Sequence, residues 1–303
     1  MRVLVTGGAG FIGSAVIQKL LEKTDQVFVI DNLSFGNRSF ISVPDNQFYQ
    51  LDIREEADVV AALEEIKPEI VLHLAAIHFI PYCNKHPFEA SDINIRGTMN
   101  LLKAIKVCGS VKQFFFASTA AVYPILDGPI SETAEKKPLD IYGLTKLVGE
   151  ELSEKFHQET GIPTIICRFF HAFGPNETNP HLIPELQQQV NDGKRTIKLG
   201  NLDPKRDFIH TSDMANAIDA LLQHVKSGIE IFNLGRGIEY SVVEVVNAFE
   251  AHLQQPIQIE VDPERVRKVE RMHLLSDISK ITRYTGWKPV VSLEEGIETL
   301  IRS

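Results

Sequence analysis

Tyr142 and Lys146 are the side chains best suited to acid–base chemistry in this chain of 303 residues. They stand four positions apart in a segment, residues 142–160, whose pattern predicts a helix, so they share one helix face. A tyrosine is a weak base at its usual pKa of about 10. A neighbouring ammonium group and a positively charged cofactor ring both favour the phenolate. Lowering the tyrosine pKa to about 7 requires roughly 4 kcal/mol of differential stabilisation.

A glycine cluster near the start of the chain indicates where such a cofactor binds. An apolar run, residues 3–5, leads into Gly7, Gly10 and Gly13, and an amphipathic segment follows. In a strand–turn–helix unit, these glycines permit a sharp turn, a close approach of backbone N–H groups to a pyrophosphate, and tight helix packing. The helix N-terminus adds a partial positive charge next to the phosphates. The pattern therefore predicts a dinucleotide site.

Asp31 indicates which dinucleotide is bound. It ends a second apolar run, residues 26–30, and lies 18 positions after Gly13. This is close to the spacing of about 20 at which an acid hydrogen-bonds the adenosine ribose. Its carboxylate would repel a 2′-phosphate, so NAD is favoured over NADP. Arg38, in the following loop, keeps NADP as an alternative.

Composition excludes several other classes of protein. A net charge of −9 argues against nucleic acid or an anionic membrane surface as the partner. No apolar run approaches the ~20 residues that cross a membrane, and an apolar strand begins too early to leave room for a signal peptide. Cys83, Cys108 and Cys167 are odd in number and match no metal-site spacing, so we expect no metal and a reducing cytoplasmic setting.

Apolar strand-like runs alternate with amphipathic helix-like segments up to Arg168. The expected strands are residues 3–6, 26–30, 47–50, 70–76, 113–118 and 164–168, and the expected helices include residues 57–66, 90–107 and 142–160. This alternation predicts an α/β fold with a doubly wound parallel sheet of Rossmann type. We expect residues 1–168 to form the NAD-binding domain, with a return at about 208–235. Residues 169–207 and 236–303 are expected to form a smaller, mixed α/β substrate-binding lobe.

The chain resembles the extended short-chain dehydrogenase/reductase family, in particular its nucleotide-sugar epimerase/dehydratase group, and most closely the UDP-galactose (UDP-glucose) 4-epimerases. The resemblance covers essentially the whole length. The matching motifs are residues 6–13, Asp31-Asn32, Asp52-Ile53, residues 73–76, Asn94, Ser118-Thr119, Tyr142-x-x-x-Lys146, residues 168–170, Gly174-Pro175, Arg206-Asp207 and residues 277–280.

The resemblance implies bound NAD, a nucleotide-diphosphate sugar (a UDP-sugar) as substrate, and a homodimer. It assigns catalysis to Thr119, Tyr142 and Lys146. The implied cofactor-binding residues are Gly7, Gly10, Phe11, Ile12, Gly13, Asp31, Asn32, Asp52, Ile53, Leu74, Ala75, Ala76, His78, Asn94, Ser118, Tyr142, Lys146 and Phe169. The implied substrate-binding residues are Thr119, His171, Arg206 and Arg267. Simpler interpretations are that Arg206 pairs with an acid such as Asp207 and that Arg267 belongs to a solvated charged run.

The reaction that the resemblance implies is 4-epimerisation through transient oxidation at C4, with Tyr142 as acid and base. Ala120 and Ala121 stand where the related dehydratases carry an Asp-Glu pair and the decarboxylases a Glu, which favours epimerisation. A 4,6-dehydratase or decarboxylase of the same family remains an alternative, as does a catalytically silent NAD-binding regulatory protein. His171 and Pro124 depart from the family pattern, so the base and the sugar stay open.

Overall fold

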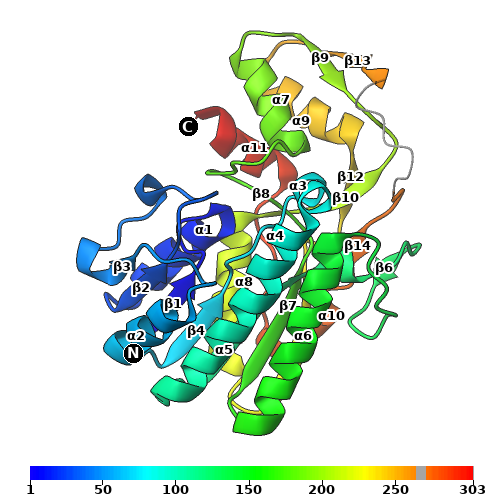
Figure 1. Cartoon of the computed structure of the whole chain (residues 1–303). Coiled ribbons are helices and arrows are strands. Elements are labelled where there is room, and N and C mark those ends of the chain that lie inside the picture. The colour runs from blue at the N-terminus through cyan, green and yellow to red at the C-terminus, as the bar shows by residue number, and fades with distance from the viewer. Residues whose placement is uncertain (264–270, 303) are drawn as a thin grey trace.

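A computed structural model describes residues 1–263 and 271–302, and within these residues seven parallel strands form the main sheet (Figure 1). The strands lie in the order β11-β7-β5-β4-β1-β2-β3. Their bounds are β1 (Val3–Thr6), β2 (Val27–Ile30), β3 (Phe48–Tyr49), β4 (Ile70–His73), β5 (Gln113–Thr119), β7 (Thr164–Phe169) and β11 (Ile229–Leu234). The doubly wound α/β fold predicted from the sequence is therefore confirmed.

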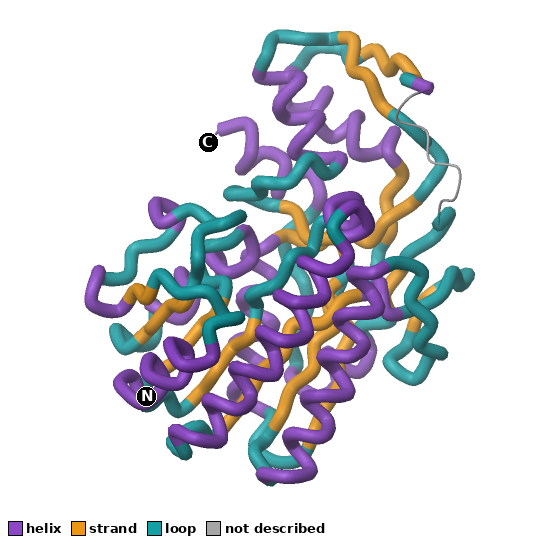
Figure 2. The backbone as a smooth tube through the Cα atoms, in the orientation of Figure 1, coloured by secondary structure: helices purple, strands orange, loops and turns teal. Residues whose placement is uncertain are grey.

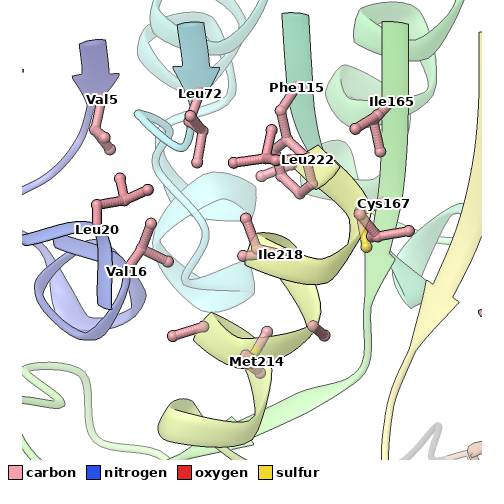
Figure 3. Packing of buried hydrophobic residues seen from close by; sticks show 14 of the residues in the cluster. Val5, Val16, Leu20, Leu72, Phe115, Ile165, Cys167, Met214, Ile218 and Leu222 are labelled. Atoms are coloured by element: carbon pink, nitrogen blue, oxygen red, sulfur yellow. The ribbon is translucent and has the colours of Figure 1, made fainter. Parts of the chain in front are cut away.

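Helices cover both faces of this sheet, which explains why its strands are apolar on both sides. One face carries α1 (Phe11–Leu21), α8 (Thr211–His224) and α10 (Ser279–Thr285). The other face carries α2 (Glu56–Ile66), α5 (Gly97–Cys108) and α6 (Ile141–Thr160), and the views show α5 and α6 running along the sheet (Figures 1 and 2). Figure 3 shows Val16 and Leu20 of α1 and Met214, Ile218 and Leu222 of α8 packed under Val5, Leu72, Phe115 and Ile165 of the strands.

A second group of elements has its own apolar core, which includes Phe173, Leu186, Val245, Phe249 and Ile297. Its helices are α7 (Leu182–Asn191), α9 (Val242–Leu253) and α11 (Leu293–Arg302). Small sheets join β8 (His171–Phe173), β10 (Lys205–His210) and β12 (Glu239–Ser241), and β9 (Thr196–Leu199) with β13 (Gln258–Val261). A third pairs β6 (Pro129–Ile130) with β14 (Leu275–Ser276). Among the helices that the structure describes, none is both long and apolar enough to cross a membrane.

The chain returns to the main sheet between these elements. The edge strand β11 pairs in parallel with β7, so that Ile229 lies beside Thr164 and Leu234 beside Phe169. Strand β10 instead lies between β8 and β12, outside the main sheet. The backbone of residues 205–210 therefore belongs to the smaller group, and α8 with β11 belongs to the main sheet.

The helix expected over residues 90–107 is interrupted in the structure. It consists of α4 (Pro87–Ser91), a π-helical turn (Asp92–Arg96) and α5. The turn contains Asn94, whose side chain is buried and exchanges hydrogen bonds with the backbone of Ile77, with N···O distances of 2.9 Å each way. The Asn94 amide also donates to Thr145 of α6 at 3.0 Å. The π-helical turn thereby fixes the loop after β4 against α6.

A buried ion pair ties α6 to the main sheet. Arg168 of β7 and Glu150 of α6 are almost fully buried, and two guanidinium N–H groups donate to the two carboxylate oxygens at 2.8 and 2.7 Å. The Ser118 hydroxyl at the end of β5 donates to the same carboxylate at 2.5 Å. Arg168 also donates to the Tyr123 hydroxyl at 2.8 Å, and this hydroxyl donates to Asn233 of β11 at 2.7 Å. Residues of three strands therefore fix the position of α6 relative to the sheet.

Replacement of Gly149 by alanine tests this packing. A Cβ atom at this position of α6 would lie 2.2 Å from the ring of Phe116, which is fully buried in β5 and has no room to move. We expect Gly149→Ala to lower the free energy of unfolding by about 1–3 kcal/mol, although alanine is the better helix former. Urea denaturation measures the change, and Glu151→Ala on the exposed side of α6 should stay within about 0.5 kcal/mol. Equal stability of both variants would contradict the close approach of α6 to β5.

Candidate active site

A cavity of about 1120 Å³ lies at the carboxyl ends of β1, β2, β4, β5 and β7. This is where ligands bind in open α/β sheets. Residues of α7, β9 and β12 form the opposite wall, so the cavity lies between the two groups of elements. Its volume is at the upper end for small-molecule sites, which are typically about 300–1,000 Å³. The cavity is large enough for a dinucleotide together with a second ligand.

Most of the site residues predicted from the sequence line this cavity. They are Gly7, Gly10, Phe11, Ile12, Gly13, Asp31, Asn32, Asp52, Ile53, Leu74, Ala75, Ala76, His78, Ser118, Thr119, Tyr142, Lys146, Phe169, His171 and Arg206. Asn94 is not among the lining residues, because its side chain is turned into the protein to hold Ile77. Arg267, predicted to bind the substrate diphosphate, lies outside the described residues.

In the glycine-rich turn, any side chain at Gly7 or Gly13 would clash with neighbouring backbone atoms. Gly7 has a φ of +72°, and a Cβ atom there would lie 2.6 Å from the backbone nitrogen of Ala75. A Cβ atom at Gly13 would lie 2.2 Å from the carbonyl oxygen of Gly7. Helix α1 begins directly after Gly10, and no side chain caps its N-terminus. The turn and the helix N-terminus thus fit a pyrophosphate group.

Asp31 is built as a hydrogen-bond acceptor at the end of β2. The carboxylate is buried and accepts from the backbone N–H groups of Ala9 at 3.0 Å and Leu33 at 2.8 Å. Burial raises the Asp31 pKa, while these two hydrogen bonds oppose the rise. Arg38 does not line the cavity; it donates to backbone carbonyls and pairs with Asp45 at 3.0 Å. The surroundings of Asp31 therefore fit a ribose diol and disfavour a 2′-phosphate.

Asp52 lines the same part of the cavity as Asp31 and Asn32. Its carboxylate accepts hydrogen bonds from Asn32 at 3.0 Å and from Arg54 at 2.7 Å. The contact with the Arg54 guanidinium is the main cause that lowers the Asp52 pKa to about 2. Asp52 is thus an anion at all working pH values and links the loops that follow β2 and β3.

The cavity wall near the end of β5 is lined by Tyr142, Thr119 and Lys146. Asp140 caps α6 by accepting the N–H of Gly143 at 2.8 Å, which sets the orientation of the first helical turn. Tyr142 and Thr119 share a hydrogen bond, which lowers the Tyr142 pKa, but burial dominates and raises it well above 10. The lowering of the Tyr142 pKa expected from the sequence depends on the Lys146 ammonium and on a positive cofactor ring, so it stays a prediction for the protein with its cofactor bound.

Lys146 is equally affected by burial. The side chain is 3% exposed, and its ammonium lies 4.8 Å from the ring centroid of Phe116. Burial lowers the Lys146 pKa to about 7, although the negative charge of Glu150 one turn away raises it. The amine can therefore gain or lose its proton near neutral pH, which suits a group that works beside an acid–base catalyst.

The cavity wall formed by the smaller group of elements carries basic residues, of which the sequence predicted only some. Arg206 and His171 line the cavity, as does Arg271, which was not singled out. One N–H of Arg206 donates to the Arg271 carbonyl at 2.7 Å, and Arg271 donates to the carbonyls of Tyr123 at 2.7 Å and Pro124 at 3.0 Å. These bonds hold two guanidinium groups on one side of the cavity.

Asp207, the acid next to Arg206, has a structural role of its own. It is fully buried, and its carboxylate accepts the backbone N–H groups of Arg236, Gly237 and Ser276. These contacts join β10 to the segments after β11 and at β14.

The loop between β8 and α7 supplies a second group of residues that was not predicted. Glu177, Thr178 and His181 line the cavity, and Glu177 and His181 lie beside His78. Glu177 and His78 are 99 positions apart in the chain, and the spacing of such distant residues carries no signal. Their proximity arises from the fold alone.

Comparisons with known proteins agree with this geometry. A family model described as GDP-mannose 4,6 dehydratase matches residues 4–300. A UDP-glucose 4-epimerase from Halalkalibacterium halodurans is 33% identical over 319 residues, covering 98% of this chain and 94% of that protein. One from Lactobacillus helveticus is 31% identical over 308 residues, covering 95% and 92%. The structure of UDP-glucose-4-epimerase from Stenotrophomonas maltophila, with bound NAD and formylated UDP-arabinopyranose, matches with a TM-score of 0.91 at 29% identity, covering 100% of this chain and 97% of that one.

The burial of Lys146 predicts a dependence of stability on pH. Its pKa is about 7 in the folded chain and returns to 10.5 on unfolding. Between these values the unfolded chain binds the additional proton, so stability rises with pH in this window. Relative to Lys146→Met, the wild-type free energy of unfolding should rise by about 2 kcal/mol from pH 7 to pH 9.

Urea denaturation at the two pH values measures this difference, with Lys155→Met on the exposed side of α6 as the matched control. A difference between wild type and Lys146→Met that stays constant or shrinks with rising pH would show that Lys146 keeps an ordinary pKa.

Proposed function

Because the chain belongs to the extended short-chain dehydrogenase family that the GDP-mannose 4,6 dehydratase model describes, we propose that it is an NAD-dependent nucleotide-sugar 4-epimerase. One observation carries the proposal: Thr119, Tyr142 and Lys146 line the cavity, together with Ala120 and Ala121. This wall offers Tyr142 as proton donor and acceptor beside Lys146, and Ala120 and Ala121 leave no carboxylate directly after Thr119. Such an arrangement suits oxidation and re-reduction at a single carbon.

NAD is the cofactor that this site fits. The glycine turn with the N-terminus of α1 would hold the pyrophosphate, and Asp31 the adenosine ribose. The relative from Stenotrophomonas maltophila has NAD bound on a matching fold. When bound, NAD supplies a hydride acceptor and a positive ring charge next to the reacting sugar carbon.

In the proposed reaction, Tyr142 moves one proton. The Tyr142 phenolate removes the proton of the C4 hydroxyl, and Thr119 hydrogen-bonds the same oxygen. Lys146 would hold the nicotinamide ribose through its hydroxyls when NAD is bound, and the charge of Lys146 would favour the phenolate. After the keto sugar has turned over, Tyr142 returns the proton to the oxygen on C4. There is no net redox change, so the cofactor can stay bound between turnovers.

The substrate is proposed to be a nucleotide-diphosphate sugar of the UDP type. Arg206 and His171 lie on the wall that faces the catalytic residues, and a planar guanidinium binds phosphate oxygens in a bidentate manner. Arg267 is proposed as a second diphosphate contact. In this proposal, residues 169–207 and 236–303 are the substrate-binding lobe, and residues 1–168 with about 208–235 are the NAD-binding domain.

A homodimer that associates through α5 and α6 is part of the proposal. Met99 and Val107 of α5 and Leu144 of α6 are about half exposed, which supports a covered surface on these helices. A surface of this kind is expected where a stable partner packs.

Proton NMR in D₂O, with a panel of UDP- and dTDP-sugars, tests the proposed reaction. We expect a new anomeric signal from the C4 epimer of one sugar, with the carbon-bound hydrogens retained. Tyr142→Phe should lower turnover by ~10²-fold or more, since a positioned general base is lost. Tyr82→Phe is the matched control, because the Tyr82 hydroxyl donates to Glu89 on α4 and the side chain does not line the cavity.

Two other results would contradict the epimerase. Deuterium at C5 with a new C6 methyl signal would indicate a 4,6-dehydratase, for which Asp140, Glu177 and Glu185 of the cavity wall are candidate carboxylates. Absence of turnover with every sugar, despite bound NAD, would indicate a silent NAD-binding protein. Full activity of Tyr142→Phe would rule out Tyr142 as the base.

A further inference from the structure

His78, Glu177 and His181 form a cluster of potential metal ligands on the cavity wall. His78 lies in the loop after β4, whereas Glu177 and His181 lie in the loop between β8 and α7. One nitrogen from each histidine and one oxygen of the carboxylate lie within 4.8 Å of one another. All three side chains are half-buried and line the cavity.

Two imidazoles and one carboxylate are a common ligand set for catalytic zinc, which keeps a fourth position for water or substrate. Ligand atoms around one tetrahedral zinc lie roughly 3.3 Å apart, since Zn–N and Zn–O distances are about 2.0–2.2 Å. The ligand atoms therefore have to approach one another by at most about 1.5 Å, from 4.8 Å to roughly 3.3 Å. Side-chain rotations are sufficient for a movement of this size.

The two histidine rings lie next to each other on the cavity wall. The His78 and His181 rings are stacked with their centroids 6.0 Å apart and an angle of 28° between their planes. The Phe79 ring lies edge-on to His181, with the ring centroids 5.4 Å apart. One nitrogen of each imidazole lies within 4.8 Å of a Glu177 carboxylate oxygen.

Asn179 supports two of the three side chains. It is 6% exposed, and its backbone N–H donates to Glu177 at 2.9 Å. Its side-chain amide nitrogen lies 3.2 Å from Nε2 of His78 and 3.5 Å from the same Glu177 oxygen. Asn179 therefore holds the His78 and Glu177 side chains next to each other.

We propose that His78, Glu177 and His181 bind one divalent transition-metal ion of the zinc type, with an open coordination position facing the cavity. The ion ties the loop after β4 to the loop before α7, and so joins the two walls of the cavity. This proposed metal site goes beyond the epimerase reaction, which needs no metal. The proposal does not depend on that reaction.

Zinc titration of the purified full-length protein, after treatment with a chelator, tests the site. Calorimetry should show one equivalent of Zn²⁺ bound with a Kd below about 1 µM. Glu177→Gln and His181→Gln should each weaken binding by roughly 100-fold or more, since loss of second-shell partners alone costs 10–100-fold. His224→Gln, an exposed histidine on α8, is the matched control and should bind as the wild type does.

Co²⁺ as a spectroscopic probe identifies the ligands. Visible d–d bands without a thiolate charge-transfer band are expected, and these bands should be lost in Glu177→Gln. Glutamine keeps an oxygen that can accept the Asn179 N–H, so this variant should retain the loop. Less than a tenth of an equivalent of Zn²⁺ on the wild type, a thiolate band, or undiminished binding by Glu177→Gln would each overturn the proposal. None of these outcomes bears on the epimerase reaction.

Discussion

The buried ion pair between Arg168 and Glu150 is the interaction on which the site depends most. The pair and the adjoining Ser118 hydroxyl hold Glu150 of α6 against strands β5 and β7. Removal of either charged partner would lower the free energy of unfolding by roughly 3–5 kcal/mol. Tyr142 and Lys146 lie on the same helix, two turns and one turn before Glu150. Their depth in the cavity is therefore set by a contact that touches neither substrate nor cofactor.

Burial also sets the proton affinities of Tyr142 and Lys146. Desolvation raises the Tyr142 pKa and lowers the Lys146 pKa, so both groups favour their neutral forms. Glu150 partly opposes this for Lys146, and Thr119 partly opposes it for Tyr142. A positive ring charge from the cofactor would act on Tyr142 in the same dry surroundings, where charge–charge interactions are strong. In the proposed mechanism, acid–base chemistry at Tyr142 is therefore linked to cofactor binding.

The sequence predicted the fold, and most of the site residues predicted from it line the cavity, because these depend on local patterns. Glycine spacing, Asp31 at a strand end, and the Tyr142–Lys146 spacing each follow from one strand or helix. The inward turn of Asn94, the contacts of Arg271, and the meeting of His78 with Glu177 depend on distant segments, which the sequence does not place side by side. The raised pKa of Tyr142 likewise depends on burial, which is a property of the packed structure.

The pKa of Tyr142 with and without NAD⁺ is the most direct measurement of this link. The ultraviolet difference signal of the phenolate, taken as wild type minus Tyr142→Phe, gives the titration of this one residue. Without NAD⁺, Tyr142 should titrate above its ordinary value of 10, and with saturating NAD⁺ roughly one to three pH units lower. A Tyr142 pKa that is the same in both states, or that already lies near 7 without NAD⁺, would contradict the account.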